Sequence, residues 1–199
     1  MNLSYRLEEP RDYAEVERLT FEAFETMEIP GRTHTDEHFL AHLLRDDPWF
    51  IPELDIVAER NGELVGSIFY SKCKVLREDG TETDAVTFGP VSVWPKLHRE
   101  GIGSAMICYS IERARELGFT AILITGHPAY YPRFGFRPAS DFGLTFEDGI
   151  AHEAFMALEL IPGALSRNKG RWKCAKAFDI AENDEAAFQN YCKVVSKIS

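Results

Sequence analysis

The stretch that decides the fold is FGPVSVWPKLHREGIGSA, residues 88–105. It reads as a strand that ends at Val93, where Trp94-Pro95 breaks it, and then as a glycine-containing loop and an amphipathic helix that begins near Gly101. The first backbone N–H groups of a helix have no intrahelical partner, and the helix dipole is positive at that end. Because Gly101 and Gly103 carry no Cβ, a pyrophosphate can approach this backbone closely. The stretch therefore predicts an anion site at the start of the helix.

Other interpretations of the same stretch are available. Gly-x-Gly before a helix also occurs in ordinary loops, so it is a weak signal on its own. A Rossmann dinucleotide site is disfavoured because residue 106 is Met, where that fingerprint requires a third glycine. Gly89-Pro90 in the preceding strand marks an edge or a bulge, since proline cannot donate to a sheet ladder and glycine weakens a strand. A plain structural edge strand is the alternative there.

Working outward from this stretch, hydrophobic periodicity and turn residues predict a mixed α/β fold. Strands are expected at 3–7, 55–60, 63–74, 85–93, 121–125 and 154–160. Helices are expected from about residue 12 to 24 and at 35–44, 101–117 and 183–197, with a short helical turn at 129–133. Asn61-Gly62 and Asp79-Gly80 are turn signals between strands. The order indicates a central mixed, mostly antiparallel sheet with helices on both faces.

Composition restricts the class of protein. The 199 residues suit one domain with a short appendage, and 45% hydrophobic residues can bury a sizeable core. A net charge of -10 argues against nucleic-acid binding, because a phosphate backbone would be repelled. No apolar run approaches the roughly 20 residues that span a bilayer, and residues 1–9 lack the apolar region of a signal peptide. We therefore expect no nucleic-acid partner, no membrane and a cytoplasmic location.

Neither metal nor thiol chemistry is expected. The cysteines are Cys73, Cys108, Cys174 and Cys192. They show no close metal or redox spacing, so buried or half-buried thiols in a reducing cytosol are favoured, with Cys108 as a core thiol rather than a nucleophile. His34, His38 and His42 repeat every four residues, a spacing that can bind zinc. A polar helix flank or the lining of an acceptor pocket is the favoured interpretation of these histidines.

Several segments together resemble the GNAT superfamily of N-acetyltransferases. That family has a Gln/Arg-x-x-Gly-x-Gly/Ala loop after its fourth strand, and HREGIG at 98–103 fits it, except that His98 stands where Gln or Arg is usual. FGPVSVWP at 88–95, GHPAYYPRFGF at 126–136, FMALEL at 155–160 and PGAL at 162–165 look like the YhbS-like branch in particular. The resemblance covers about residues 1–165, which we take as the acetyltransferase domain, with 166–199 as a C-terminal extension.

The resemblance implies transfer of an acetyl group from acetyl-CoA to a primary amine, on a small molecule or a peptide, by direct attack. The loop would hold the coenzyme A pyrophosphate, although Glu100 puts a negative charge near it. A bulge would part the fourth strand from the fifth, so that the fourth pairs with the pantetheine arm and one N–H stabilises the developing oxyanion. The implied cofactor-binding residues are Val91, Ser92, Val93, His98, Arg99, Glu100, Gly101, Ile102, Gly103 and Ser104.

The same resemblance implies that Tyr131 is the general acid that protonates the departing thiolate. A phenol with a pKa of about 10 suits that role. Tyr130 is the adjacent alternative, and a purely structural tyrosine is another. The general base is not identified, but the loop between the first two helices usually borders the acceptor pocket in this family, which makes Glu28, His34 and Asp36 candidates.

Other functions and roles stay open at this point. A GNAT-like domain could hold acyl-coenzyme A as a sensor without turnover, or the loop could bind another phosphate-bearing ligand such as a nucleotide. His127 could face the cofactor or simply belong to a turn. The basic segment around Trp172 could contact the 3′-phosphate of the coenzyme, meet an acidic partner or form a solvated face. The final helix could dock on the sheet or on a second subunit, as in a homodimer.

Overall fold

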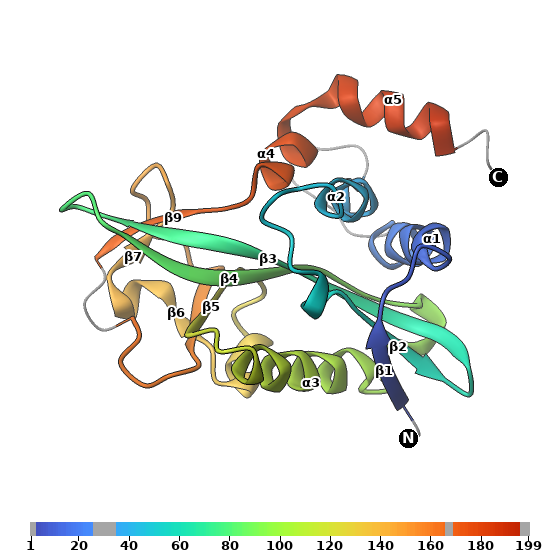
Figure 1. Ribbon diagram of the computed structural model, residues 1–199, viewed down its shortest axis with the longest axis horizontal. Helices are drawn as coiled ribbons and strands as arrows, with labels where there is room; N and C mark the ends of the chain where they lie inside the picture. Colours follow the sequence, from blue (N-terminus) through green and yellow to red (C-terminus); the bar gives the residue numbers. More distant parts are fainter. Residues whose placement is uncertain (1–2, 26–34, 166–168, 196–199) are drawn as a thin grey trace. The chain divides into compact units, whose positions relative to one another are not determined.

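The computed structural model describes residues 3–25, 35–165 and 169–195 (Figure 1). The strands are β1 Leu3–Leu7, β2 Ile56–Arg60, β3 Glu63–Arg77, β4 Glu82–Val93, β5 Ala121–Thr125, β6 Arg137–Pro138, β7 Leu144–Thr145, β8 Phe155–Glu159 and β9 Gly170–Lys173. The α-helices are α1 Tyr13–Phe24, α2 Glu37–Leu44, α3 Ile102–Glu116, α4 Lys176–Asn183 and α5 Glu185–Val195. Short 3-10 helices are η1 Pro52–Leu54, η2 Pro95–Leu97, η3 Tyr131–Phe134 and η4 Ala139–Phe142.

The chain divides into two compact units. Unit 1 holds residues 1–69, 90–107 and 175–199, and unit 2 holds residues 70–89 and 108–174. The strands β3 and β4 and the helix α3 each run along the chain from one unit into the other. Most strand pairs are antiparallel, whereas β4 with β5 and β7 with β9 are parallel. The mixed, mostly antiparallel sheet predicted from the sequence is therefore confirmed.

The sheet of unit 1 begins with the antiparallel strands β1, β2 and β3. β1 pairs with β2 from Leu3 opposite Arg60 to Leu7 opposite Ile56. β2 and β3 form a tight hairpin, and its central residues Asn61 and Gly62 have φ angles of 56° and 82°. Two positive φ angles are what an Asn-Gly turn of this type requires, so the chain reverses where the sequence predicts it.

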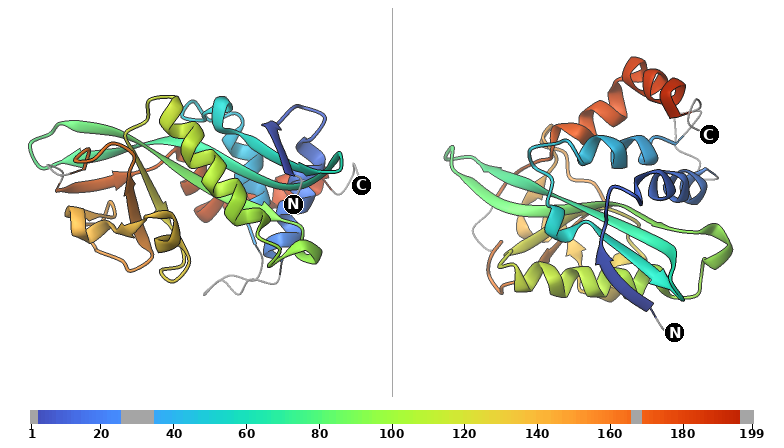
Figure 2. Two further views of the ribbon diagram at one scale, coloured as in Figure 1. Left: turned by 90° about the horizontal axis from the view of Figure 1, so that it is seen from below. Right: turned by 45° about the vertical axis from the view of Figure 1, so that its right-hand side comes forward.

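Helices α1 and α2 lie side by side in both views of Figure 2, and α4 packs on α2. Their apolar faces form one buried cluster with the start of the sheet and with α5. Its large members are Val16, Leu19, Phe39, Leu40, Leu44, Val57, Phe69, Trp94, Phe188 and Tyr191. The helix expected from about Asn183 begins at Glu185, because Asp184 leaves the helical region and its Oδ1 accepts the N–H of Ala187. The preceding helix α4 was not predicted from the sequence.

Unit 2 is built around strands β5 and β8, which pair from Ala121 opposite Glu159 to Thr125 opposite Phe155. β9, a strand that was not predicted from the sequence, pairs with the end of β3. Its Trp172 is buried and stacks on Phe155 with ring centroids 4.8 Å apart. The indole is therefore part of the core of unit 2 and does not belong to a solvated basic face.

Candidate functional site

The loop between β4 and α3 turns the chain through two left-handed residues. The 3-10 helix η2 follows Trp94, and His98 ends it by donating its backbone N–H to the carbonyl of Pro95 at 3.1 Å. Arg99 and Gly101 then have φ angles of 66° and 82°, and α3 begins at Ile102. A glycine favours such a φ at little cost, whereas a side chain at 101 would be strained. The glycine that the sequence singled out is therefore required by the turn itself.

The start of α3 presents unpaired backbone donors. The first helical bond runs from the N–H of Ala105 to the carbonyl of Gly101 at 3.0 Å. The N–H groups of Ile102 and Gly103 precede that bond and, within the part of the chain that the structure describes, have no backbone acceptor. A Cβ placed on Gly101 would meet nothing within 4 Å, so the space beside this turn is open. The backbone donors on which the predicted anion site depends are therefore present at the start of α3, and the anion site itself stays a prediction.

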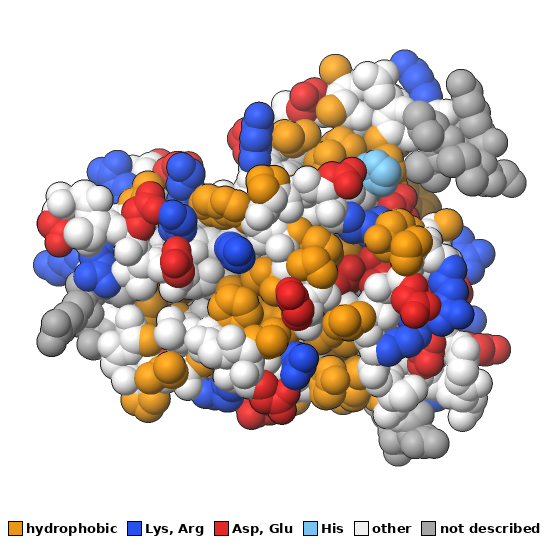
Figure 3. All heavy atoms as spheres, in the orientation of Figure 1, with side chains coloured by type: hydrophobic (Ala, Val, Ile, Leu, Met, Phe, Trp, Pro, Cys, Tyr) orange, Lys and Arg blue, Asp and Glu red, His pale blue; other side chains and the backbone are white. Residues whose placement is uncertain are grey.

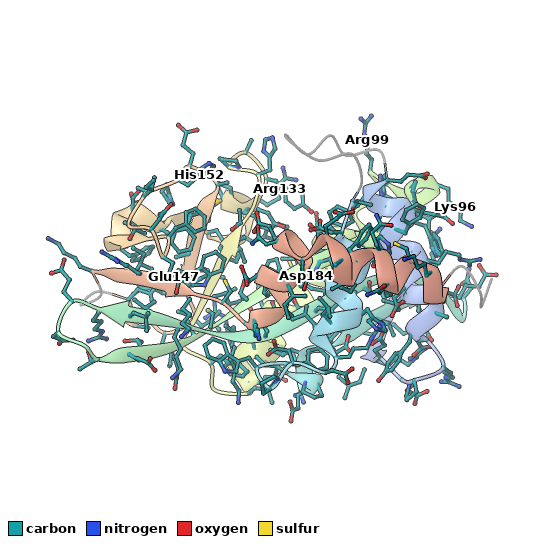
Figure 4. All side chains as sticks on the ribbon, turned by 90° about the horizontal axis from the view of Figure 1, so that it is seen from above. Lys96, Arg99, Arg133, Glu147, His152 and Asp184 are labelled. Carbon is teal, nitrogen blue, oxygen red and sulfur yellow. The ribbon has the colours of Figure 1, made fainter. Side chains whose placement is uncertain are left out.

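Two side chains of the loop have partners of their own. His98 Nε2 lies 2.9 Å from the backbone oxygen of Val93, and Glu100 forms an ion pair with Arg60 at 2.6 Å. Arg60 ends β2, so the pair fastens the loop to the first hairpin of unit 1. The carboxylate that the sequence placed near the phosphates therefore has its own cation. Arg99 is exposed and projects away from the ribbon in Figure 4.

The end of β4 has one edge paired and one edge that faces away from β3. The backbone N–H of Trp94 donates a hydrogen bond to the backbone carbonyl of Val65 on β3, at 3.3 Å. Since backbone groups alternate between the two edges of a strand, those of Val91 and Val93 point to the opposite edge. The hydroxyl of Ser92 is buried and donates to Thr20 at 3.0 Å. Ser92 is therefore a packing residue by its side chain, and Val91 and Val93 direct their backbone groups to the edge away from β3.

Gly89-Pro90 lies where β4 passes from unit 2 to unit 1. Gly89 has a φ of 152°, and Pro90 has no N–H to give to a neighbouring strand. Before this pair, β4 is parallel to β5, with Val86 opposite Ile122. Within the described residues this is the one register pair between the two strands. The local geometry is consistent with the edge or bulge predicted from the sequence.

Tyr131 begins η3 in unit 2 and stands among aromatic rings. Its ring centroid lies 5.7 Å from that of Phe136, 5.9 Å from Phe88 and 5.2 Å from Tyr130. A Cβ placed on Gly126 would lie 2.1 Å from the Tyr131 ring, so the absence of a side chain at 126 makes room for it. Tyr131 is half-buried. The aromatic contacts and the glycine together fix the plane of this phenol.

A second tyrosine that the sequence analysis did not single out lies beneath the same rings. Tyr70 is fully buried on β3, and its hydroxyl is 3.0 Å from that of Ser110 on α3. Burial raises the pKa of Tyr70, and the neighbouring Tyr131 adds to that shift. The Tyr70 ring lies 5.2 Å from Phe88, which in turn contacts Tyr131. Tyr70 is thus a neutral, structural phenol beneath the candidate acid.

The residues suggested for the acceptor side are only partly described. Glu28 and His34 lie outside the described residues, and Asp36 is buried at the start of α2. His38 is buried between the rings of Phe21, Phe188 and Tyr191. His42 contacts Glu17 at 3.2 Å. Within the described residues no group of His, Cys, Asp or Glu side chains could hold a metal ion.

Two further sequence expectations concern His127 and Cys108. The ring of His127 accepts the backbone N–H of Ala129 at 3.2 Å, which is the behaviour of a turn histidine. The expectation of a core thiol at Cys108 is wrong, because this residue is exposed on α3. Ile107 and Ile111 form the buried stripe of the helix, and position 108 lies about 100° around the helix from position 107.

An open pocket lies beside the loop in unit 1. It has a volume of about 340 Å³ and is lined by Arg18, Glu22, Trp94, Pro95 and Lys96. The guanidinium of Arg18 and the ammonium of Lys96 lie 5.1 Å and 5.9 Å from the centroid of the Trp94 ring. Lys96 is seen at the edge of the molecule in Figure 4. Two cations and one carboxylate therefore border this surface next to the anion site.

The molecular surface carries charges of both signs. On the face drawn in Figure 3, Lys and Arg side chains lie among Asp and Glu side chains.

None of the helices formed by the described residues has the length and apolar character needed to cross a bilayer.

Comparisons with known proteins show the family of this chain. The family model for the acetyltransferase (GNAT) domain matches residues 4–139. Two relatives from Escherichia coli strain K12 are each named as an uncharacterized N-acetyltransferase. YjhQ is 29% identical over 139 residues, which cover 68% of this chain and 76% of the relative. YhbS is 27% identical over 161 residues, which cover 81% of this chain and 89% of the relative.

Solved structures show the same fold. The crystal structure of Escherichia coli YhbS in complex with CoA has a TM-score of 0.77 at 24% identity and covers 90% of this chain and 93% of its own. A GNAT family acetyltransferase from Brucella melitensis in complex with acetyl-CoA has a TM-score of 0.70 at 26% identity and covers 89% of this chain and 98% of its own. Because the family model spans more than half of the residues and both the sequence and the fold match YhbS, this chain belongs to the GNAT acetyltransferase family as a YhbS-like member.

Proposed function

We propose that this protein is an acetyl-CoA-dependent N-acetyltransferase that passes the acetyl group directly to a primary amine. The observation that carries the proposal is the pair of N–H groups at Ile102 and Gly103, which have no backbone acceptor among the described residues and begin a long helix, after an open turn at Gly101, in a GNAT chain. That the solved relatives were crystallised with CoA and with acetyl-CoA supports the choice of cosubstrate.

In the proposed complex the coenzyme pyrophosphate accepts hydrogen bonds from these amides and from the positive end of α3. Side chains of the loop contribute less to binding the pyrophosphate, because His98 contacts the carbonyl of Val93 and Glu100 forms an ion pair with Arg60. Arg99 is the exposed cation of the loop and can approach a phosphate. Glu100 does not repel the ligand strongly, since Arg60 balances its charge.

The pantetheine arm then lies along the open edge of β4. The carbonyl of Val93 already meets the His98 ring, so the arm pairs with the backbone groups of Val91 and with the N–H of Val93. One such N–H directed at the thioester oxygen stabilises the negative charge that develops as the amine attacks. Comparable donors contribute about 3 kcal/mol to the transition state.

The transfer itself requires an acid and a neutral amine. The amine nitrogen attacks the thioester carbonyl, the C–S bond breaks, and the departing thiolate takes a proton from the Tyr131 phenol, whose ordinary pKa is about 10. The rings that surround Tyr131 and the missing side chain at Gly126 fix the phenol in one plane, as an acid in this position needs. The acceptor is a small molecule or a peptide with a primary amine.

The deciding experiment is a thiol-release assay with a panel of amines, run on the wild type, Tyr131→Phe and the matched control Tyr130→Phe. We expect Tyr131→Phe to lower kcat by about 10²-fold or more while the Kd for acetyl-CoA, measured by calorimetry, stays within about twofold. Tyr130→Phe should stay near wild-type activity.

Two outcomes would contradict the proposal. Tight acetyl-CoA binding without turnover on any amine would identify an acyl-coenzyme A sensor. Competition by ADP as strong as by acetyl-CoA would identify a nucleotide-like ligand, because the pantetheine arm would then add nothing to binding. The cytoplasmic location, the domain boundary at residue 165, and the absence of a metal, a membrane and a nucleic-acid partner stay predictions from the sequence.

A further inference from the structure

Two cysteines far apart in sequence come to face each other at the end of a strand pair. β3 and β9 are antiparallel, with Lys74 opposite Lys173 and Arg77 opposite Gly170 (Figure 1). One residue further at the end of this ladder, the same register brings Cys73 opposite Cys174. Directly opposite residues of an antiparallel pair have Cα atoms about 4.5–5.5 Å apart, a separation that a disulfide can bridge.

Both sulfurs point to the same side of the strands. Side chains alternate along a strand, and Cys73 and Trp172 face the core of unit 2, whereas Lys74 and Lys173 face the other way. Cys174 is two residues beyond Trp172 and packs against the same core cluster. Burial, and next the Cys73 sulfur, raise the pKa of Cys174, as expected of two neighbouring thiols. The register, extended by one residue, therefore places both side chains on one face, as a disulfide between them requires.

A buried donor accompanies the pair. The indole Nε1 of Trp172 is buried and has no hydrogen-bond partner among the described residues. Burial raises the pKa of Cys73 to about 12, and the Trp172 N–H beside the sulfur opposes that shift. An N–H directed at sulfur stabilises a thiolate. Cys73 is thus a fully buried thiol, while Cys174 is half-buried and accessible to a small reagent.

We propose that Cys73 and Cys174 form a modification site at which a peroxide joins them in a reversible intramolecular disulfide. The Cys174 thiolate attacks the peroxide, a sulfur–oxygen bond forms, the O–O bond breaks and hydroxide leaves. The Cys73 thiolate then attacks the sulfenic sulfur, the S–S bond forms, the S–O bond breaks and a second hydroxide leaves. The two hydroxides take up the two protons that the thiols released when they ionised. In total, two thiols and one hydrogen peroxide give one disulfide and two waters, and a dithiol reductant reverses the change.

The consequence is local and independent of acetyl transfer. Cys174 is followed at once by α4, whose N-terminal residue is Lys176. A disulfide there fixes the end of β9 to β3 immediately before the C-terminal helices begin. It also closes a loop of about 100 residues, and the entropy that a cross-link removes from the unfolded chain increases with loop length.

The test uses the reduced full-length protein treated with hydrogen peroxide. We expect two of the four thiols to disappear, peptide mapping to find Cys73 joined to Cys174, and Tm to rise by about 5 °C or more until dithiothreitol is added. Because burial raises the pKa of both thiols, the rate should increase as the pH rises from 7 to 9.

Cys174→Ser should abolish both the cross-link and the change in Tm, whereas Cys108→Ser, at an exposed thiol, should retain them. The proposal is overturned if mapping of the oxidised wild type finds Cys73 and Cys174 still separate, or finds them joined to Cys108 or Cys192 instead. The map of the wild type needs no variant, so it decides the matter even if Cys174→Ser folds poorly.

Discussion

Gly126→Ala tests whether the room for the Tyr131 ring is needed for catalysis. A Cβ at position 126 would lie 2.1, 2.5 and 3.1 Å from three carbons of that ring. Ordinary contacts begin at 3.4 Å, so the nearest ring carbon must retreat by about 1.3 Å. The backbone at 126 cannot yield easily, because its N–H donates to the carbonyl of Ala154 at 2.8 Å.

The size of the effect follows from that displacement. Overpacking of this kind costs about 1–3 kcal/mol of folding free energy, and a shift of about 1 Å in a catalytic group costs about 10²-fold in rate. We therefore expect kcat in the thiol-release assay to fall by about 10²-fold, with a modest fall in Tm. The Kd for acetyl-CoA should stay within about twofold, because position 126 and the amides of α3 belong to different units.

A double-mutant cycle separates the phenol from a general loss of fold. If the methyl group added at position 126 acts through the ring, adding Gly126→Ala to a Tyr131→Ala background should change kcat by less than about twofold, since no ring is left to displace. Full additivity of the two substitutions would refute the reasoning, as would a Gly126→Ala enzyme with wild-type kcat.

Two further substitutions probe the charges of unit 1. Arg60→Ala should weaken acetyl-CoA binding by about threefold at low salt, because it leaves the Glu100 carboxylate without its cation beside the phosphates, and the Arg60→Ala/Glu100→Ala double variant should recover it. Asp55→Asn should flatten the pH dependence of stability. Burial, and then the neighbouring Glu8, raise the pKa of Asp55 from 3.8 to about 9, so the folded state holds a proton that the unfolded state loses. The free energy of unfolding of the wild type should therefore fall as the pH rises between these values. Urea unfolding at pH 5 and pH 8 measures this free energy for the wild type and for Asp55→Asn.

Local sequence signals predicted most elements of the fold, because each had its own physical cause. Asn61-Gly62 set the first hairpin through two positive φ angles, and α3 begins at Ile102, one residue past Gly101. β9 was missed although Trp172 lies between Arg171 and Lys173, an alternation typical of a half-buried strand. The many Lys and Arg residues of this segment favoured its interpretation as a basic surface, so its period-2 pattern was not read as a strand.

Contacts between distant residues could not be predicted. The partner of Glu100 is 40 residues away, and the carbonyl met by His98 belongs to the preceding strand. Neither partner is encoded by a spacing within one element, because both depend on how the first hairpin and the loop meet in the folded chain. Cys108 was assigned to the core because of its apolar neighbours, although a helix turns position 108 away from the stripe of Ile107.

An acidic chain that binds a polyanionic cosubstrate needs a local source of positive potential, and the loop indicates where it lies. The net charge of -10 acts over the whole molecule, but salt screens it within about 8 Å at physiological ionic strength. Backbone amides and the helix dipole act at contact distance and are strongest within the first turn. Glu100 is paired and His98 is held on Val93, so those amides are the donors that keep their direction. Under the proposed function, His98 in place of the usual Gln or Arg is therefore compatible with phosphate binding, because the donors depend on the path of the backbone through Gly101.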